Sequence, residues 1–234
     1  MLAEHASGRL PAEDLPRDVL TAIMMNADQL GMARTMIRRE VAFYLQAGSH
    51  STANLFAHAS HQVFARMGDR TFAARTGDQA FLQRCVFETL RLHPASPVAW
   101  RRAQCEITLS SGATLPAGSL VELDLQAANT DPAVWGPQAG LFDPDRVLPE
   151  GVPPWGHSFG GGMHACIGME LDGGVYNAED HSAEPEPVFG TVTLMIHALL
   201  KNGAHPDPDE APTRDALSRR ENFSRYPIVF GHRR

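Results

Sequence analysis

The pattern of apolar and polar positions along this chain predicts one dominant helix. From about Met36 to Met67, apolar residues recur in steps of three and four, and no proline interrupts them. At 1.5 Å per residue, a helix of this length spans roughly 45 Å. The pattern therefore indicates a domain that is crossed by one long helix.

Shorter helical patterns occur on both sides of this stretch. Apolar spacing predicts helices from Asp18 to Leu30, over residues 76–93, and from Phe189 to Leu200. The helix over residues 76–93 is expected to end at His93-Pro94, because proline cannot continue a helix. A further short helix is expected to end at Gly173-Gly174, where two glycines weaken it.

The remaining segments predict short strands and loops. Residues 97–130 alternate in short apolar runs that are separated by Gly, Pro and Ser turns, a pattern typical of strands in hairpins. Residues 131–157 and 203–216 are predicted as loops, and Tyr226 to Phe230 as a terminal strand. The expected fold class is mainly α with small β-hairpins (α+β), in a single domain over residues 1–234.

Composition narrows the class of protein. The chain has 234 residues, 43% of them apolar, which is enough for a real core. Its net charge of −7 argues against nucleic acid as a partner. Three widely spaced cysteines form no CxxC pair and favour a reducing compartment. With no signal-peptide pattern and no apolar run as long as a membrane span, we expect a cytoplasmic protein and no membrane partner.

One glycine-rich loop carries candidate chemistry. Three consecutive glycines, Gly160 to Gly162, precede Cys166, and Gly168 follows it. Glycines let the main chain approach a flat ligand closely, and a thiolate at the end of such a loop can ligate a soft metal or haem iron. The alternative is a surface turn with an ordinary buried cysteine.

The long helix has an unusual centre, Ala47-Gly48-Ser49-His50-Ser51-Thr52. Glycine costs about 1 kcal/mol in a helix interior, and Ser and Thr compete there for backbone hydrogen bonds. This small, polar stretch indicates either close packing or a site where a ligand lies on the helix.

A third feature is a charged pair, Glu88 and Arg91, on the helix over residues 76–93. Residues three apart share a helix face, so the pair is either an exposed ion pair worth a few tenths of a kcal/mol or a pair buried among its apolar neighbours.

Together, in this order, the features resemble the cytochrome P450 family of haem-thiolate monooxygenases. The segment from Phe159 to Gly168 fits that family's Phe-Gly-x-Gly-x-x-x-Cys-x-Gly loop. Glu88-Thr89-Leu90-Arg91 fits its Glu-x-x-Arg motif, and Arg146 lies where the family places the third member of that ion-pair network. Each motif alone is weak, but the ordered set is specific.

The resemblance implies a haem b cofactor (iron protoporphyrin IX) with Cys166 as its iron ligand. Phe159 would shield the thiolate. The glycines of the loop, Gly160, Gly162 and Gly168, would let its backbone pass close to the sulfur. Arg101 and His164 match the family's positions for holding the haem propionates, although His164 can also be read as a solvated loop residue. Glu88, Arg91 and Arg146 would form a structural ion-pair network below the haem.

On the oxygen side of the haem, the family motif reads Ala/Gly-Gly-x-Asp/Glu-Thr-Thr/Ser. Here Gly48 matches, His50 replaces the acid and Ser51 replaces the usual threonine, with Thr52 next to it. The resemblance implies catalytic roles for His50, Ser51 and Thr52 and a cofactor-binding role for Gly48: Ser51 keeps a hydroxyl that can hold a water, and His50 can relay protons near neutral pH.

Two further departures affect the expected function. Residues 172–187 form an atypical polar insertion where the family has a continuous helix, and the resemblance covers only the C-terminal half of a family member. The expected function is oxygen insertion into a small organic substrate, with electrons from an external ferredoxin or flavoprotein reductase. Alternatives are a haem-thiolate protein that is not a monooxygenase, a module that needs a partner chain or self-association, and a nonfunctional gene fragment.

Overall fold

The computed structural model describes residues 1–175, 188–218 and 220–231. It divides into two compact units, Met1–His50 and Ser51–Arg234, and the boundary lies inside helix α3 (Arg34–Phe64). The long helix predicted from about Met36 to Met67 is confirmed, since α3 runs from Arg34 to Phe64. The prediction of a single haem domain over residues 1–234 stays a prediction, and most of the predicted insertion lies outside the described residues.

The first unit contains α1 (Leu2–Ala6), a 3-10 helix η1 (Ala12–Asp14), α2 (Val19–Asn26) and the first half of α3. The Asp18 carboxylate accepts a hydrogen bond of 2.7 Å from the Thr21 amide and so caps α2. The helix predicted from Asp18 is confirmed, but it ends earlier than Leu30.

The second unit holds most of the fold. Its helices after α3 are α4 (Arg70–Arg75), α5 (Gln79–Leu92), α6 (Leu125–Asn129), α7 (Pro132–Trp135), η2 (Gly162–His164), α8 (Met169–Gly173) and α9 (Thr191–Lys201). Its strands are β1 (Val98–Arg102), β2 (Ile107–Thr108), β3 (Thr114–Leu115), β4 (Leu120–Asp124), β5 (Ala204–Pro206), β6 (Thr213–Arg214), β7 (Phe223–Arg225) and β8 (Ile228–Phe230). They form antiparallel pairs β1–β4, β2–β3, β5–β8 and β6–β7. The predicted class, mainly α with small hairpins, is confirmed.

Three predictions about local structure were wrong. The segment 131–157, predicted as loop, contains the short helix α7, which the Asp131 side chain caps by accepting from the Ala133 amide at 2.8 Å. Residues 125–129 are helical rather than extended, because the Asp124 side chain caps α6 by accepting from the Ala127 amide at 2.8 Å. The segment 203–216, predicted as loop, contains β5 and β6, which pair with strands later in the chain.

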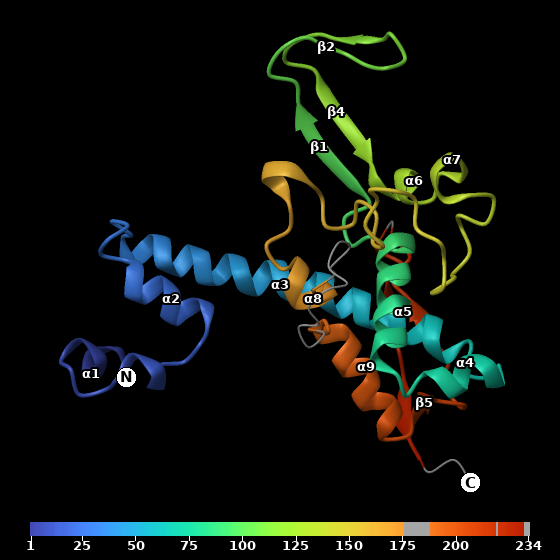
Figure 1. Cartoon of the computed structure of the whole chain (residues 1–234), viewed down its shortest axis with the longest axis horizontal. Coiled ribbons are helices and arrows are strands. Elements are labelled where there is room, and N and C mark those ends of the chain that lie inside the picture. The colour runs from blue at the N-terminus through green and yellow to red at the C-terminus, as the bar shows by residue number, and fades with distance from the viewer. Residues whose placement is uncertain (176–187, 219, 232–234) are drawn as a thin grey trace. The chain divides into compact units, whose positions relative to one another are not determined.

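The core of the second unit is built around α5. Nearly all of its residues are buried, and α9 packs along it (Figure 1). The buried cluster also takes in the C-terminal half of α3, with Leu55, Ala59 and Val63. Cys85 lies inside this cluster, and burial raises the pKa of its thiol to about 12. A helix buried on all sides gives a rigid support for the side chains that it carries.

Among the described residues, no helix combines the length and the apolar character needed to cross a membrane. The cytoplasmic location stays a prediction.

Candidate functional site

The glycine loop closes on itself and ends at Cys166. The Cys166 amide donates a hydrogen bond of 2.8 Å to the Phe159 carbonyl. Gly160 has φ +68°, and a Cβ there would lie 3.1 Å from the His164 carbonyl oxygen. Gly162 also has positive φ, at +58°. A side chain at Gly160 would be strained and crowded, so this fold of the loop requires glycine.

The loop rests on aromatic side chains and exposes its cysteine. Phe159 is 9% exposed and its ring lies 5.5 Å from that of Trp155, which in turn lies 5.2 Å from Phe87 of α5. The Cys166 thiol is exposed, and Ile167 next to it is 70% exposed. The sulfur therefore lies on an open, partly apolar surface above a packed aromatic base.

Below the loop, Glu88, Arg91 and Arg146 come together as one buried ion network. Arg91, 0% exposed, makes two hydrogen bonds of 2.7 Å to the Glu88 carboxylate. The Arg146 guanidinium reaches the same carboxylate at 3.1 Å. Arg91 also donates to the carbonyls of Asn129 and Ala139, at 2.6 and 2.7 Å. The pair on α5 is thus buried, and it fixes the segment 129–146 to the core helix.

Asn129 connects this network to the cysteine loop, and the sequence analysis missed it. Its amide donates to the Arg91 carbonyl at 3.1 Å and to the Ser158 hydroxyl at 2.9 Å, while its oxygen accepts from the His157 amide at 2.7 Å. Ser158 in turn donates to the Leu90 carbonyl at 2.6 Å. Asn129 is fully buried, but it belongs to no motif, because its partners lie far away in sequence.

One residue of the polar centre of α3, Thr52, is hydrogen-bonded to the helix that follows the cysteine. Ala47 to His50 are exposed, and a Cβ built on Gly48 meets no atom of the described residues within 4 Å. Thr52 instead donates to the Asp172 carboxylate of α8, at 2.7 and 2.9 Å. Burial raises the pKa of Asp172, and the bond from Thr52 opposes that shift. Close packing at Gly48 finds no support here, whereas Thr52 connects α3 to the helix that follows the cysteine.

The two predicted propionate partners lie on separate elements. Arg101 is on β1, and its guanidinium donates to the Trp100 carbonyl at 2.8 Å. His164 is exposed on η2. Their roles stay predictions, as do those of Gly48, His50, Ser51 and Thr52.

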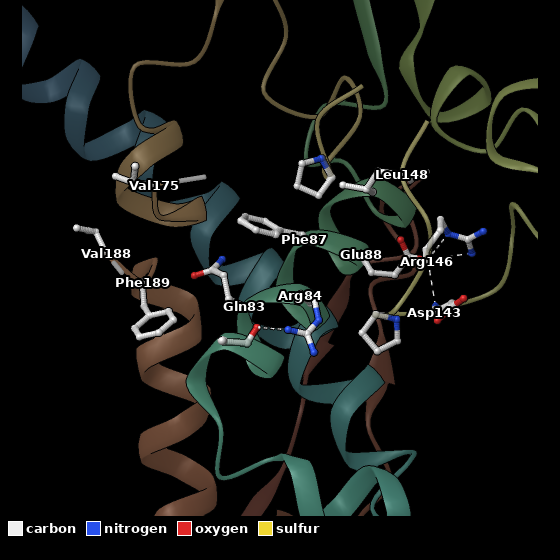
Figure 2. A pocket seen from close by; sticks show the side chains of 13 residues that line it. Gln83, Arg84, Phe87, Glu88, Asp143, Arg146, Leu148, Val175, Val188 and Phe189 are labelled. Atoms are coloured by element: carbon white, nitrogen blue, oxygen red, sulfur yellow. Dashed lines mark hydrogen bonds and ion pairs between the residues drawn. The ribbon is translucent and has the colours of Figure 1, made fainter. Parts of the chain in front are cut away.

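A cavity of about 330 Å³ lies beside the ion network, between α5, the segment 143–154 and the chain on either side of the break after α8 (Figure 2). Its lining is mostly apolar and includes Phe87, Leu148 and Phe189, with Glu88 and Arg146 at one side. No residue of the Gly160–Gly168 loop lines it. The cavity is therefore distinct from the surface that surrounds the Cys166 thiol.

Comparisons with known proteins agree with this fold. The family model "Cytochrome P450" matches residues 66–171. Taurochenodeoxycholic 6 alpha-hydroxylase of Sus scrofa is 31% identical over 218 residues, which cover 80% of this chain and 42% of that protein. Cytochrome P450 4A10 of Rattus norvegicus is 29% identical over 215 residues, covering 83% of this chain and 38% of that protein.

Solved structures are similar over nearly the whole chain. CYP154A1 from Streptomyces coelicolor A3(2) matches with a TM-score of 0.68 and 24% identity, covering 98% of this chain and 51% of its own. CalO2 matches with a TM-score of 0.69 and 22% identity, covering 98% and 52%. At these identities the likeness shows the fold alone. The chain belongs to the cytochrome P450 family, and it spans about half the length of the relatives that it matches.

The residues around Cys166 fit a haem. Cys166 is free and exposed, so its thiolate could bind a haem iron. The glycines at 160 and 162 keep side chains away from the backbone in front of it. The neighbouring Met163 and Ile167, 93% and 70% exposed, offer apolar contact to a flat ring.

Proposed function

We propose that this chain supplies the haem-thiolate part of a cytochrome P450 monooxygenase, with Cys166 as the iron ligand. The observation that carries the proposal is the exposed Cys166 thiol at the end of a closed glycine loop. That loop is supported by the buried network of Glu88, Arg91 and Arg146 through Asn129. A ligand that must hold iron in one position needs such a rigid base.

The bound group would be haem b, held by the Cys166 thiolate and by contacts of the loop backbone at Gly160, Gly162 and Gly168. A haem bound through this thiolate would supply the activation of dioxygen that precedes insertion of one oxygen atom into an organic molecule. Phe159, which is buried next to the loop, would shield one side of the thiolate. The cationic Arg101 and the imidazole of His164 would pair with the two propionates.

In the altered motif on α3, His50 and Ser51 would transfer protons in place of the family's carboxylate and threonine. The His50 imidazole can relay protons, and the Ser51 hydroxyl can hold a water in place. Thr52 is already hydrogen-bonded to Asp172, so its part is to hold the helix against α8. Gly48 leaves room on the helix surface.

The reaction would take a small organic substrate, and its electrons would come from a separate ferredoxin or flavoprotein reductase. The name of the porcine relative, a hydroxylase of taurochenodeoxycholic acid, fits oxygen insertion. The family membership supports this class of reaction.

The reduced, CO-bound absorption spectrum of the full chain loaded with haem tests the proposal. The wild type should give the strongly red-shifted thiolate band. Cys166→Ser should lose it, and Cys105→Ser, which replaces another exposed cysteine, should keep it. Absence of the band in the wild type, or its persistence in Cys166→Ser, would rule out this ligand.

A second candidate function is that of a haem-binding half that needs a partner chain or self-association. Two observations favour it. The chain covers 38–52% of the length of the relatives described above, and α2 with the first half of α3 exposes large apolar side chains. These are Val19, Leu20, Met24, Met25, Met36, Phe43, Tyr44 and Leu45. Light scattering after size exclusion should then show association, and a stable haem-loaded monomer would contradict it.

A further inference from the structure

The helix that follows the cysteine is broken, but its two parts stay together. Helix α8 ends at Gly173 and α9 begins at Thr191. The chain leaves and returns at one point, because Gly174 and Phe189 form an antiparallel bridge and the Val175 amide donates to the Val188 carbonyl at 2.9 Å. The break therefore interrupts the hydrogen bonds of the helix without separating its ends.

Gln83 of α5 supplies hydrogen bonds that the break removes. Its amide nitrogen donates to the Gly173 carbonyl at 2.5 Å, and its oxygen accepts from the Gly190 amide at 2.9 Å and the Thr193 hydroxyl at 3.0 Å. In an unbroken helix, the Gly173 carbonyl would accept from the amide four residues later. Gln83 is buried. Without its side chain, the Gly173 carbonyl, the Gly190 amide and the Thr193 hydroxyl would lose this partner at a place where water could not replace it.

Helix α8 has only five residues, too few to be stable alone. Three consecutive residues are held from outside. The Leu171 carbonyl accepts from the Thr191 hydroxyl at 2.9 Å, Asp172 from Thr52, and Gly173 from Gln83. Of these three donors, only Gln83 is buried. Gln83 also comes from a different helix, α5, and bonds the Gly190 amide just before α9. Figure 2 shows its side chain on the side of the cavity where Val188 and Phe189 lie.

The end of α8 is coupled directly to the cysteine loop. A Cβ on Gly173 would lie 3.1 Å from the Phe159 ring, so that ring packs against the α8 backbone. At the other end, the Met169 amide donates to the Cys166 carbonyl at 3.3 Å, and the Asp172 amide to the Gly168 carbonyl at 3.0 Å. A shift of the α8 end would move both Phe159 and the backbone that carries Cys166.

We propose that Gln83 is a positioning residue for Cys166: by joining α8 to α9 across the break, it holds the thiolate in the geometry that binds iron. The effect on iron rests on the proposed function, whereas the support of α8 does not. Gln83 therefore replaces, with side-chain hydrogen bonds, the backbone hydrogen bonds that would join α8 to α9 in a continuous helix.

Gln79 offers a matched control. It lies one turn earlier on α5 and also bonds α9, through its amide and the His197 imidazole at 3.2 Å, but among the described residues no hydrogen bond joins its side chain to α8. We expect Gln83→Leu to convert much of the red-shifted CO band to the form without thiolate ligation. Gln79→Leu should keep the band.

Amide hydrogen exchange on the full chain gives a readout that does not depend on haem. In Gln83→Leu, the amides of Asp172 and Gly174 should exchange about tenfold faster, the ratio that corresponds to about 1.4 kcal/mol. Gln79→Leu should leave them unchanged. If Gln83→Leu does not fold, Thr193→Val, which removes one partner of Gln83, should show the same changes to a smaller extent.

Rescue separates positioning from packing. Removing residues 174–189 joins Gly173 to Gly190, which lies against the backbone of Asp172 and Gly173. In the Gln83→Leu background this deletion should restore the CO band, because backbone amides then replace the lost donor. Equal effects of the two Gln→Leu variants, or no rescue, would overturn the proposal. If the wild type lacks the CO band, the proposed function is wrong. If amide exchange is then still faster in Gln83→Leu and not in Gln79→Leu, the support of α8 by Gln83 remains correct.

Discussion

At the scale of single residues, Glu88 has the most consequential environment in the second unit. Its carboxylate is almost inaccessible and accepts from Arg91, Arg146 and the Asp143 amide, the last at 3.1 Å. Burying such charges is costly, so the network adds little net stability compared with a well-packed apolar core. Removing one partner, however, leaves uncompensated charge in the interior.

We predict that Glu88→Gln lowers the free energy of unfolding by about 3–5 kcal/mol, because both guanidinium groups lose their counter-charge. Urea denaturation measures the change. The control is Asp145→Asn, which weakens the exposed ion pair with Arg75 and should cost about 1 kcal/mol or less. Similar losses in the two variants would contradict a special role for the buried network.

A second residue-scale feature is the stacked pair of His58 and His93, with ring centroids 4.4 Å apart and planes 10° from parallel. Burial lowers the pKa of each to about 4, and each also feels the positive charge of Arg214. The His93 imidazole also contacts the Gln62 amide at 3.1 Å. Both imidazoles are therefore neutral in the folded chain near pH 7.

We predict that stability falls on acidification. The folded pKa of His58, about 4, lies below the ordinary 6.5, so the unfolded chain binds more protons between these values. The stabilisation is complete above pH 6.5 and is lost as the pH falls toward 4. For His58 alone, the loss from pH 7 to 5 is about 2 kcal/mol. Denaturation at several pH values measures it.

The control for this pH effect is a pair of substitutions. His58→Phe keeps an aromatic ring in the stack and cannot take up a proton, so its stability should depend less on pH below 6.5. His157→Phe replaces an exposed histidine and should keep the full dependence. A wild type whose stability is flat from pH 7 to 5 would contradict the prediction.

How far the site could be predicted from sequence depends on how local each contact is. Cys166, Glu88 and Arg91 were found because their partners lie a few residues away in a recognisable order. Asn129 and Gln83 were missed because their partners are 28 to 110 residues away. A polar residue that is buried only through distant contacts has no pattern in the sequence around it.

At the scale of elements, too, helices with a local sequence pattern were predicted, and strands defined by distant partners were missed. Apolar spacing predicted α3, α5 and α9, since a buried helix face leaves a periodic pattern. It missed β5 and β6, which have three and two residues and are defined by pairing with distant strands. The break between α8 and α9 was visible in Gly173-Gly174, but nothing in the sequence showed that its ends meet.

We predict that Gly190→Ala destabilises the second unit by about 1–3 kcal/mol, because its Cβ would lie 2.1 Å from the Asp172 carbonyl oxygen. The joined ends of α8 and α9 would have to move apart. Thermal unfolding measures the loss. Gly140→Ala, where a Cβ meets nothing within 4 Å, serves as the control, and equal losses in the two variants would speak against close contact at the break.

At the scale of the whole molecule, the chain spans about half the length of its relatives, and its first unit exposes an apolar helix. On α2, Leu20 and Met24 are 49% and 44% exposed and lie one turn apart. Large exposed apolar surfaces favour association in water.

We predict that Leu20→Glu combined with Met24→Glu reduces association of the full chain, because two charges would enter the apolar contact. Light scattering at several protein concentrations measures the change in mass. Leu217→Glu, at a side chain that is 98% exposed on the second unit, should leave association as it is. A wild type that is monomeric at every concentration would contradict the prediction.

The three cysteines have a practical consequence for experiments on this chain. Cys105 and Cys166 are exposed, whereas Cys85 lies in the core with its thiol fully protonated near pH 7. An alkylating reagent should therefore add two groups to the native chain and three to the unfolded one. A haem held at Cys166 would lower the native number to one. Intact mass after alkylation can thus report both folding and cofactor ligation.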